Sequence, residues 1–240
     1  MRILITGANR GLGYELAEEA CARGHDVAAG VRSPEASGCD RLRELAGRYP
    51  GKLDIIPLDV TSESSVSAAV KMLAGEGTAD GRVQPIDAVI NSAAILLGRE
   101  QRLEELDFEA VEQTFRTNVF GPMLVMKYIL PHLRDGEHSC VLNISSEAGS
   151  FQNGYGGDYS YALSKSALNM FSGQLRSLLK PRNITVYAIH PGWIRTDMGG
   201  SQAPGDASES AAGILDIAER KAIPESGALF IDHRGKRMPL

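Results

Sequence analysis

Short apolar segments alternate with longer amphipathic segments along the 240-residue chain. Segments apolar on both faces, as expected of strands buried in a parallel sheet, lie at 3–5, 27–31, 53–60, 86–94, 139–149, 184–192 and 227–233. Helical periodicity occupies 11–24, 41–48, 63–74, 103–133, 159–179 and 209–220, interrupted near Gly121 and Pro122. Thr61 or Ser62 can cap the third of these helices. The alternation predicts a doubly wound, mostly parallel, seven-stranded α/β sheet with helices on both faces.

Two segments lack this periodicity. Gly75, Gly77, Asp80 and Gly81 are typical of turns and predict a surface loop. The segment 193–208 is rich in Gly, Ser, Pro and Asp and predicts a mobile lid. The length suits one α/β domain, so residues 1–240 are interpreted as a single domain.

Composition and charge narrow the function classes. The chain is 43% hydrophobic and 23% charged, which is typical of a globular protein. A net charge of −5 provides no basic surface for nucleic acid or an anionic membrane, and no apolar run approaches a membrane span. An apolar strand at the N-terminus without a preceding signal peptide favours a cytoplasmic protein.

The three cysteines have no metal-ligand or disulfide spacing, so no metal site is expected. Cys21 and Cys140 fall within apolar patterns and are expected to be small core residues, while Cys39 lies apart from both.

A glycine-rich turn joins the first strand to the first helix. Gly7, Gly11 and Gly13 follow the strand in the order TG-x-x-x-G-x-G. Glycines here allow a tight turn and close approach of a ligand, and the helix N-terminus offers free N–H groups to an anion. The arrangement favours a dinucleotide-binding βαβ unit of the Rossmann type, although the spacing differs from G-x-G-x-x-G.

Small and polar residues gather at the predicted carboxyl ends of the strands, where ligands bind in a doubly wound sheet. These residues are Gly7 to Gly13, Arg32, Asp59 with Val60, Asn91 to Ala94, Ser145 with Ser146, and Pro191 with Gly192. Packing alone would not select such residues, so the edge is the candidate site.

Tyr161 and Lys165 lie four residues apart, on one face of the 159–179 helix. A lysine ammonium next to the phenol is expected to lower its pKa from the usual value of about 10. A tyrosine tuned in this way can act as a general acid–base near neutral pH.

These residues resemble the short-chain dehydrogenase/reductase (SDR) family, in its branch of single-domain enzymes. The matching motifs are TGANRGLG at 6–13, DV at 59–60, NSAA at 91–94, Asn118 within RTNVFG, NISS at 143–146, YALSK at 161–165 and PGWIRT at 191–196. The motifs occur in the family's order and cover essentially the whole chain. Two departures are NSAA where family members usually read NNAG, and a slightly long interval between Ser146 and Tyr161.

The resemblance implies hydride transfer between a nicotinamide and a carbonyl or alcohol substrate. Tyr161 would exchange a proton with the substrate oxygen, and Lys165 would bind the nicotinamide ribose and depress the tyrosine pKa. Ser146 would hydrogen-bond the substrate carbonyl, with Ser145 as the alternative. Asn118 would hold a water in a proton relay beside Lys165.

The resemblance also assigns a cofactor site. Its glycines would hold the pyrophosphate, Asp59 the adenine, Asn91 to Ala93 the adenosine ribose, and the segment around Ile194 and Thr196 the carboxamide. The full set is Gly7, Asn9, Arg10, Gly11, Leu12, Gly13, Arg32, Asp59, Val60, Asn91, Ser92, Ala93, Tyr161, Lys165, Pro191, Gly192, Ile194 and Thr196.

The residue after the second strand predicts the cofactor. An acidic residue there would accept from the ribose 2′-hydroxyl of NAD, whereas an arginine would pair with the 2′-phosphate of NADP. The chain has Arg32 and no acid before Glu35, and Arg10 can approach the same phosphate. NADP(H) is therefore predicted in preference to NAD(H); the alternative is that both arginines are solvated surface charges.

The substrate and partners are less defined. Phe151, Tyr155, Tyr159, Trp193 and Met198, together with Ser146, are predicted to line a pocket for an apolar or aromatic carbonyl compound. The C-terminal tail resembles the carbonyl-reductase-like C-factor subgroup, which leaves an NADP-binding regulatory protein with little turnover as an alternative function. A sugar-nucleotide epimerase or dehydratase is a further alternative, but its larger C-terminal domain does not fit in this length. The resemblance implies a homodimer or homotetramer formed through the helices near 103–133 and 159–179.

Overall fold

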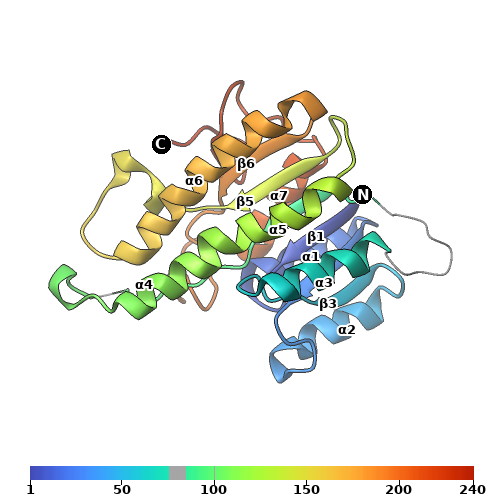
Figure 1. The fold of residues 1–240 in the computed structure, drawn as a ribbon, viewed down its shortest axis with the longest axis horizontal. Helices are drawn as coiled ribbons and strands as arrows, with labels where there is room; N and C mark the ends of the chain where they lie inside the picture. Colours follow the sequence, from blue (N-terminus) through green and yellow to red (C-terminus); the bar gives the residue numbers. More distant parts are fainter. Residues whose placement is uncertain (76–84, 100) are drawn as a thin grey trace.

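The computed structural model describes residues 1–75, 85–99 and 101–240, and within them it contains a seven-stranded sheet (Figure 1). Its strands are β1 (Arg2–Thr6), β2 (Asp26–Val31), β3 (Leu53–Pro57), β4 (Ala88–Asn91), β5 (Cys140–Ile144), β6 (Thr185–His190) and β7 (Phe230–Asp232). They run in the order β3-β2-β1-β4-β5-β6-β7, and every neighbouring pair is parallel. The predicted doubly wound fold is confirmed, with a sheet that is wholly parallel.

Helices cover both faces of the sheet. One face carries α1 (Gly11–Ala22), α2 (Asp40–Arg48) and α7 (Ala207–Ala218), and the other carries α3 (Glu63–Ala74), α5 (Gly121–Ile129) and α6 (Tyr159–Leu179), next to which lies α4 (Phe108–Phe115) (Figure 1). Side chains alternate between the two cores, because Ile3 and Ile5 pack on the α1 face while Leu4 packs on the α3 face. This explains strands in which apolar residues follow one another without alternation.

The strand order reverses between β1 and β4, which places a crevice at their carboxyl ends. The hydroxyl oxygen of Thr6, the last residue of β1, accepts from the backbone N–H groups of Ser92 and Ala93, each at 3.1 Å. This threonine therefore holds the loop after β4 next to the glycine turn.

The long fourth helical segment differs from the prediction. It begins as α4 at Phe108, and the interruption is a π-helical stretch (Arg116–Phe120) that ends just before Gly121. A Cβ at Gly121 would lie 3.0 Å from the side chain of Val60, so this glycine lets α5 approach the residues after β3. Ser62 caps α3 by accepting from the N–H of Ser65, at 3.3 Å.

Gly75 ends α3 in a left-handed conformation, with φ of 73°. The rest of the predicted surface loop, with Gly77, Asp80 and Gly81, lies outside the described residues.

The segment predicted to be a mobile lid, 193–208, is folded against itself. The N–H of Arg195 donates to the carbonyl of Gly205, and the N–H of Gly205 donates to the carbonyl of Trp193, each at 3.0 Å. Helix α7 begins at Ala207, so the last two residues of the predicted lid are helical, and the helix ends before the predicted residue 220. Asp206 caps α7 by accepting from the N–H of Ser208 at 2.9 Å, which explains the earlier start.

Cys21, Cys39 and Cys140 are buried and free. Among the described residues, no group of three or more His, Cys, Asp or Glu side chains is placed to hold a metal ion. In the same part of the chain, no helix combines the length and apolarity needed to span a bilayer.

Candidate functional site

The backbone of the glycine turn packs so closely against itself and against Ala93 that two of its positions admit no side chain. A Cβ at Gly13 would lie 2.2 Å from the carbonyl oxygen of Gly7, and one at Gly7, where φ is 68°, would lie 2.8 Å from Cα of Ala93. The N–H of Gly7 donates to the carbonyl of Gly30 at 2.9 Å, which joins the turn to β2. The turn thus presents backbone rather than side chains to the crevice.

The N-terminus of α1 is free to receive an anion. Its N-cap residue, Arg10, makes no side-chain hydrogen bond to the helix within the described residues, and the first turn contains no acid. The N–H groups of that turn therefore retain their capacity for a phosphate. Gly7, Gly11 and Gly13 fit the pyrophosphate of a dinucleotide in this respect.

Arg10 and Arg32 are both exposed, as a residue that meets a phosphate at the rim would be. Arg10 forms an ion pair with Asp197 at 3.1 Å, between two side chains that are largely exposed. Arg32 follows directly after β2, as predicted. Asn9 lies near Gly38, and Leu12 is buried in the α1 core rather than exposed to the crevice.

The other predicted cofactor residues lie along the same edge. Asp59 and buried Val60 follow β3, and one carboxylate oxygen of Asp59 accepts from the N–H and hydroxyl of Thr61. The side chain of Asn91 is buried and donates to Asn143 at 2.8 Å, so the backbone, rather than this amide, faces the crevice beside Ser92 and Ala93.

The chain after β6 completes this edge. Pro191 accepts a hydrogen bond from Ser210, Gly192 has φ of 91°, and Ile194 is buried. Cγ2 of Thr196 would lie 3.4 Å from a Cβ at Gly11, so the segment closes on the glycine turn.

The two adjacent serines after β5 have different surroundings. The hydroxyl of Ser146 accepts from the N–H of Ala148 at 3.2 Å and lies close enough to Tyr161 to lower the pKa of its phenol. The hydroxyl of Ser145 is buried and donates to Asn169 at 2.6 Å. Only Ser146 therefore has its hydroxyl beside the tyrosine.

Lys165 is buried beneath Tyr161, with Nζ 5.4 Å from the centre of the ring. Its ammonium donates to the carbonyl of Ile144 at 2.7 Å, and burial lowers the pKa of Lys165 to about 7. Burial raises the pKa of Tyr161 to about 12, while the neighbouring Ser146 hydroxyl acts in the opposite direction. The expectation that Lys165 lowers the pKa of Tyr161 is wrong for this state, because the ammonium points to a carbonyl and is itself desolvated.

Asn118 lies in the π-helical stretch, and its side chain is fully engaged. Its amide oxygen accepts from the N–H of Ile95, and its nitrogen donates to the carbonyl of Ile95 and to Ser164, at 2.9 to 3.0 Å. A π-helical turn displaces backbone groups from the regular ladder and is frequent at functional sites. Any contact of Asn118 with a relay water would therefore use its backbone.

Most of the predicted substrate residues are exposed. Phe151 is 84% exposed, Trp193 57% and Tyr155 52%, whereas Met198 is half-buried. The Trp193 ring N–H donates to the carbonyl of Gly199 at 2.8 Å, and Tyr155 donates to Asp158 at 3.0 Å. Their exposure suits contact with an apolar molecule.

Three polar residues at this edge were missed from the sequence. Asp158 precedes α6 with φ of 46°, and Arg99 lies 3.9 Å from its carboxylate; both act on the electrostatics of Tyr161. His190 ends β6, and its Nδ1 accepts from the N–H of Glu147 at 3.2 Å. The position of His190 directly before Pro191 and Gly192 was the available signal.

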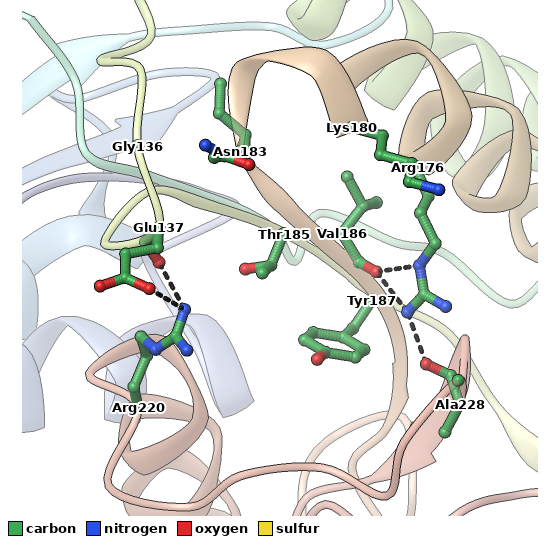
Figure 2. Close-up of a pocket in the computed structure, with 12 residues that line it drawn as sticks. Gly136, Glu137, Arg176, Lys180, Asn183, Thr185, Val186, Tyr187, Arg220 and Ala228 are labelled. Carbon is green, nitrogen blue, oxygen red and sulfur yellow. Dashed lines mark hydrogen bonds and ion pairs between the residues drawn. The ribbon is translucent and has the colours of Figure 1, made fainter.

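A cavity of about 820 Å³ lies at the opposite edge of the sheet, where β6 begins (Figure 2). Its two arginines are bound by the protein: Arg176 donates to the carbonyls of Val186 and Ala228, and Arg220 donates to the carbonyl of Glu137. Arg176 also stacks over Tyr187. These contacts tie β6 to its neighbours, and the cavity is remote from the Ser146–Tyr161 pair.

Comparison with known proteins agrees with this geometry. Residues 1–207 match the family model described as short chain dehydrogenase. The chain is 36% identical over 156 residues to C-signal of Myxococcus xanthus, an alignment that covers 65% of this chain and 93% of that protein. It superposes on the NADPH-bound carbonyl reductase from chicken fatty liver with a TM-score of 0.87 and 30% identity, covering 100% and 98% of the two chains. Superposition on the carbonyl reductase Sniffer of D. melanogaster has a TM-score of 0.88 and 29% identity, covering 100% and 99%.

Proposed function

The chain belongs to the short-chain dehydrogenase family of oxidoreductases, and from this premise we propose that it is an NADP(H)-dependent carbonyl reductase that uses Tyr161 as its general acid–base. The observation that carries the proposal is the placement of the Ser146 hydroxyl close enough to Tyr161 to lower its pKa, at the carboxyl edge of the sheet, with Lys165 buried beneath. A nicotinamide held along the glycine turn would supply the hydride.

Proton transfer follows from these contacts. The phenol of Tyr161 is protonated at neutral pH, since its pKa is raised to about 12, so it is ready to donate to an oxygen that gains negative charge. The hydroxyl of Ser146 would donate a second hydrogen bond to the same oxygen. Both features favour reduction of a carbonyl over oxidation of an alcohol.

Lys165 would serve the site in two ways. Its ammonium can bind ribose hydroxyls in addition to the carbonyl of Ile144, and in its charged form it stabilises the phenolate left after proton transfer. A pKa of about 7 means that ligand contacts, which favour the charged lysine, would raise its protonation. Asn118 would support this end of the site through its rigid contacts to Ile95.

The NADP(H) preference rests on Arg32. Its exposed side chain follows β2, where the adenosine ribose would lie, and exposed Arg10 in the glycine turn would approach the same phosphate from the other side. Arg10 would exchange its exposed ion pair with Asp197 for the 2′-phosphate, at little cost because exposed pairs contribute only about 0–1 kcal/mol. The NADPH bound to the chicken reductase supports this preference.

A regulatory protein that binds NADP with little turnover is the second candidate. The similarity to C-signal, over 93% of that protein, favours it. Binding alone does not require Tyr161 and Ser146 to lie together above a buried lysine, and this arrangement favours the reductase.

NADPH oxidation in the presence of aldehydes, ketones and quinones tests the proposal, with 4-nitrobenzaldehyde and menadione as first probes. Tyr161→Phe removes the transferable proton and keeps the ring, so we expect a loss of turnover of about 100-fold or more with unchanged NADPH affinity. Tyr187→Phe, in the remote cavity at the start of β6, is the matched control and should retain activity. Turnover that survives in Tyr161→Phe contradicts the assignment, and NADPH binding without turnover of any probe favours the regulatory candidate.

Quaternary structure and location complete the proposal. We infer a cytoplasmic homo-oligomer formed through α5 and α6, whose outer surfaces expose Met123, Leu163, Met170 and Leu178; Phe120, at the end of the π-helical stretch, is exposed next to α5. Leu163, Met170 and Leu178 recur at helical spacing and form one apolar stripe. Sedimentation velocity measures the size of the assembly.

We also propose that the segment 193–208 closes over the bound substrate.

A further inference from the structure

Strand β6 fixes the short backbone segment that carries Ser146. The N–H of Ser145 donates to the carbonyl of Ile189 at 2.7 Å, and the N–H of Glu147 donates to Nδ1 of His190 at 3.2 Å. Consecutive residues of β6 therefore bind the residues on either side of Ser146. The serine lies between two anchors, and one of them is a side chain.

The other end of this segment is bound to α6. The carbonyl of Gly149 accepts from Ser166 at 2.8 Å and from Asn169 at 3.3 Å. A Cβ at Gly149 would lie 2.7 Å from the backbone carbon of Lys165, so the turn is pressed against the helix. Of the contacts that orient Ser146 from β6, only the one from His190 depends on an ionisable side chain.

The donor at this contact determines the state of the imidazole. Because Glu147 contributes an N–H, Nδ1 of His190 must be unprotonated, and the proton lies on Nε2, which faces the Glu147 carboxylate at 3.9 Å. The charged groups around the ring are Glu147 and, from the end of β7, Asp232 and His233. Burial, reinforced by His233, lowers the pKa of His190 and keeps the ring neutral.

We propose that His190 is a positioning residue for Ser146: its neutral imidazole holds the Glu147 amide and thereby aims the serine hydroxyl at Tyr161. A proton on Nδ1 would place two donors against each other and release the segment. This inference rests on the proposed role of Ser146 as the hydrogen-bond donor to the substrate oxygen.

Nitrogen-15 NMR of the imidazole tests the contact without turnover, using His190→Asn to assign the signals. We expect the Nε2–H tautomer at neutral pH, with a titration below the usual range of histidine. A ring protonated on Nδ1 at neutral pH would overturn the proposal.

Kinetics test the consequence. His190→Leu keeps bulk but removes the acceptor, so kcat with NADPH and 4-nitrobenzaldehyde should fall about fivefold, the effect of one neutral hydrogen bond, with unchanged NADPH affinity. His190→Asn offers an amide oxygen near the position of Nδ1 and should restore most of kcat, and it should lack the fall in activity at acid pH that the wild type shows. His138→Leu, at an exposed site before β5, is the matched control.

A double-mutant cycle separates positioning from general damage. In the Ser146→Ala background, His190→Leu should cause no further loss, because the group that it aims is absent. An equal loss in both backgrounds, or wild-type kcat in His190→Leu, would refute positioning. An unaffected Ser146→Ala enzyme would instead refute the proposed function on which the inference rests.

Discussion

Burial of Lys165 sets a trade-off between stability and activity that a single substitution exposes. The side chain is 2% exposed and its ammonium donates to the carbonyl of Ile144. Desolvation lowers its pKa from 10.5 to about 7 in the folded protein. Between these values the unfolded chain binds more protons than the folded chain, so the free energy of unfolding rises with pH through this window. Below a pH of about 7 the lysine is charged in both states, and the full free-energy cost of burying the charge lowers the stability of the folded protein.

The fall in pKa corresponds to about 5 kcal/mol, at about 1.36 kcal/mol for each factor of ten. Lys165→Met has similar length and removes the charge, but it leaves the Ile144 carbonyl unpaired, which costs about 1–3 kcal/mol. At about pH 6 we therefore expect the cofactor-free variant to be more stable than the wild type by about 2–4 kcal/mol. By about pH 9 the wild type regains about 3 kcal/mol, so the advantage nearly disappears.

Urea unfolding of cofactor-free protein, followed by circular dichroism, measures this difference at the two pH values. The wild type, Lys165→Met and Lys180→Met are compared; Lys180 follows the same helix and is exposed, so its variant should show no pH-dependent difference. Turnover should be lost in Lys165→Met alone. A stability difference between Lys165→Met and the wild type that does not change with pH, or that grows as pH rises, would refute the reasoning.

Two further predictions concern the cofactor. Arg32→Asp should weaken NADPH binding at least tenfold, because a charged hydrogen bond of about 1.5–3 kcal/mol is replaced by repulsion. The affinity for NADH should be unchanged or improved. Equal affinities of the wild type for both cofactors, measured by fluorescence titration, would contradict this prediction. Gly13→Ala places a Cβ 2.2 Å from the Gly7 carbonyl and should lower the free energy of unfolding by more than about 2 kcal/mol with loss of NADPH binding. Gly47→Ala in α2, where a Cβ meets nothing within 4 Å, is the control. It should raise the free energy of unfolding by up to about 1 kcal/mol, as measured by urea unfolding. A Gly13→Ala protein with wild-type stability would show that the turn can open and would contradict the prediction.

Local patterns were sufficient for the fold. Seven strands that are apolar on both faces must be covered by helices on both sides. With a helix between successive strands, this predicts a parallel, doubly wound sheet, and that sheet is observed. The glycine turn was also predictable, since the short spacing of Gly7, Gly11 and Gly13 brings strand and helix together locally. Helix limits were less predictable: the side-chain cap at Asp206, rather than periodicity, set the start of α7.

Charge states in the site depended on long-range contacts. The four-residue spacing of Tyr161 and Lys165 placed them on one face, and from that alone a lowered tyrosine pKa was expected. Burial of both residues, and the Ile144 carbonyl that binds the ammonium, reverse the direction. Neither the depth of burial nor the distant carbonyl can be inferred from spacing along a helix.

The sequence by itself determined the parallel sheet, the glycine turn and the edge where polar residues collect, because each follows from periodicity or neighbouring residues. The tertiary structure decided which serine meets Tyr161, since Ser145 is taken by Asn169 of α6. It likewise decided that His190 binds the Glu147 amide. Such contacts join segments far apart in the chain, and the packing of β5, β6 and α6 sets their distances and orientations.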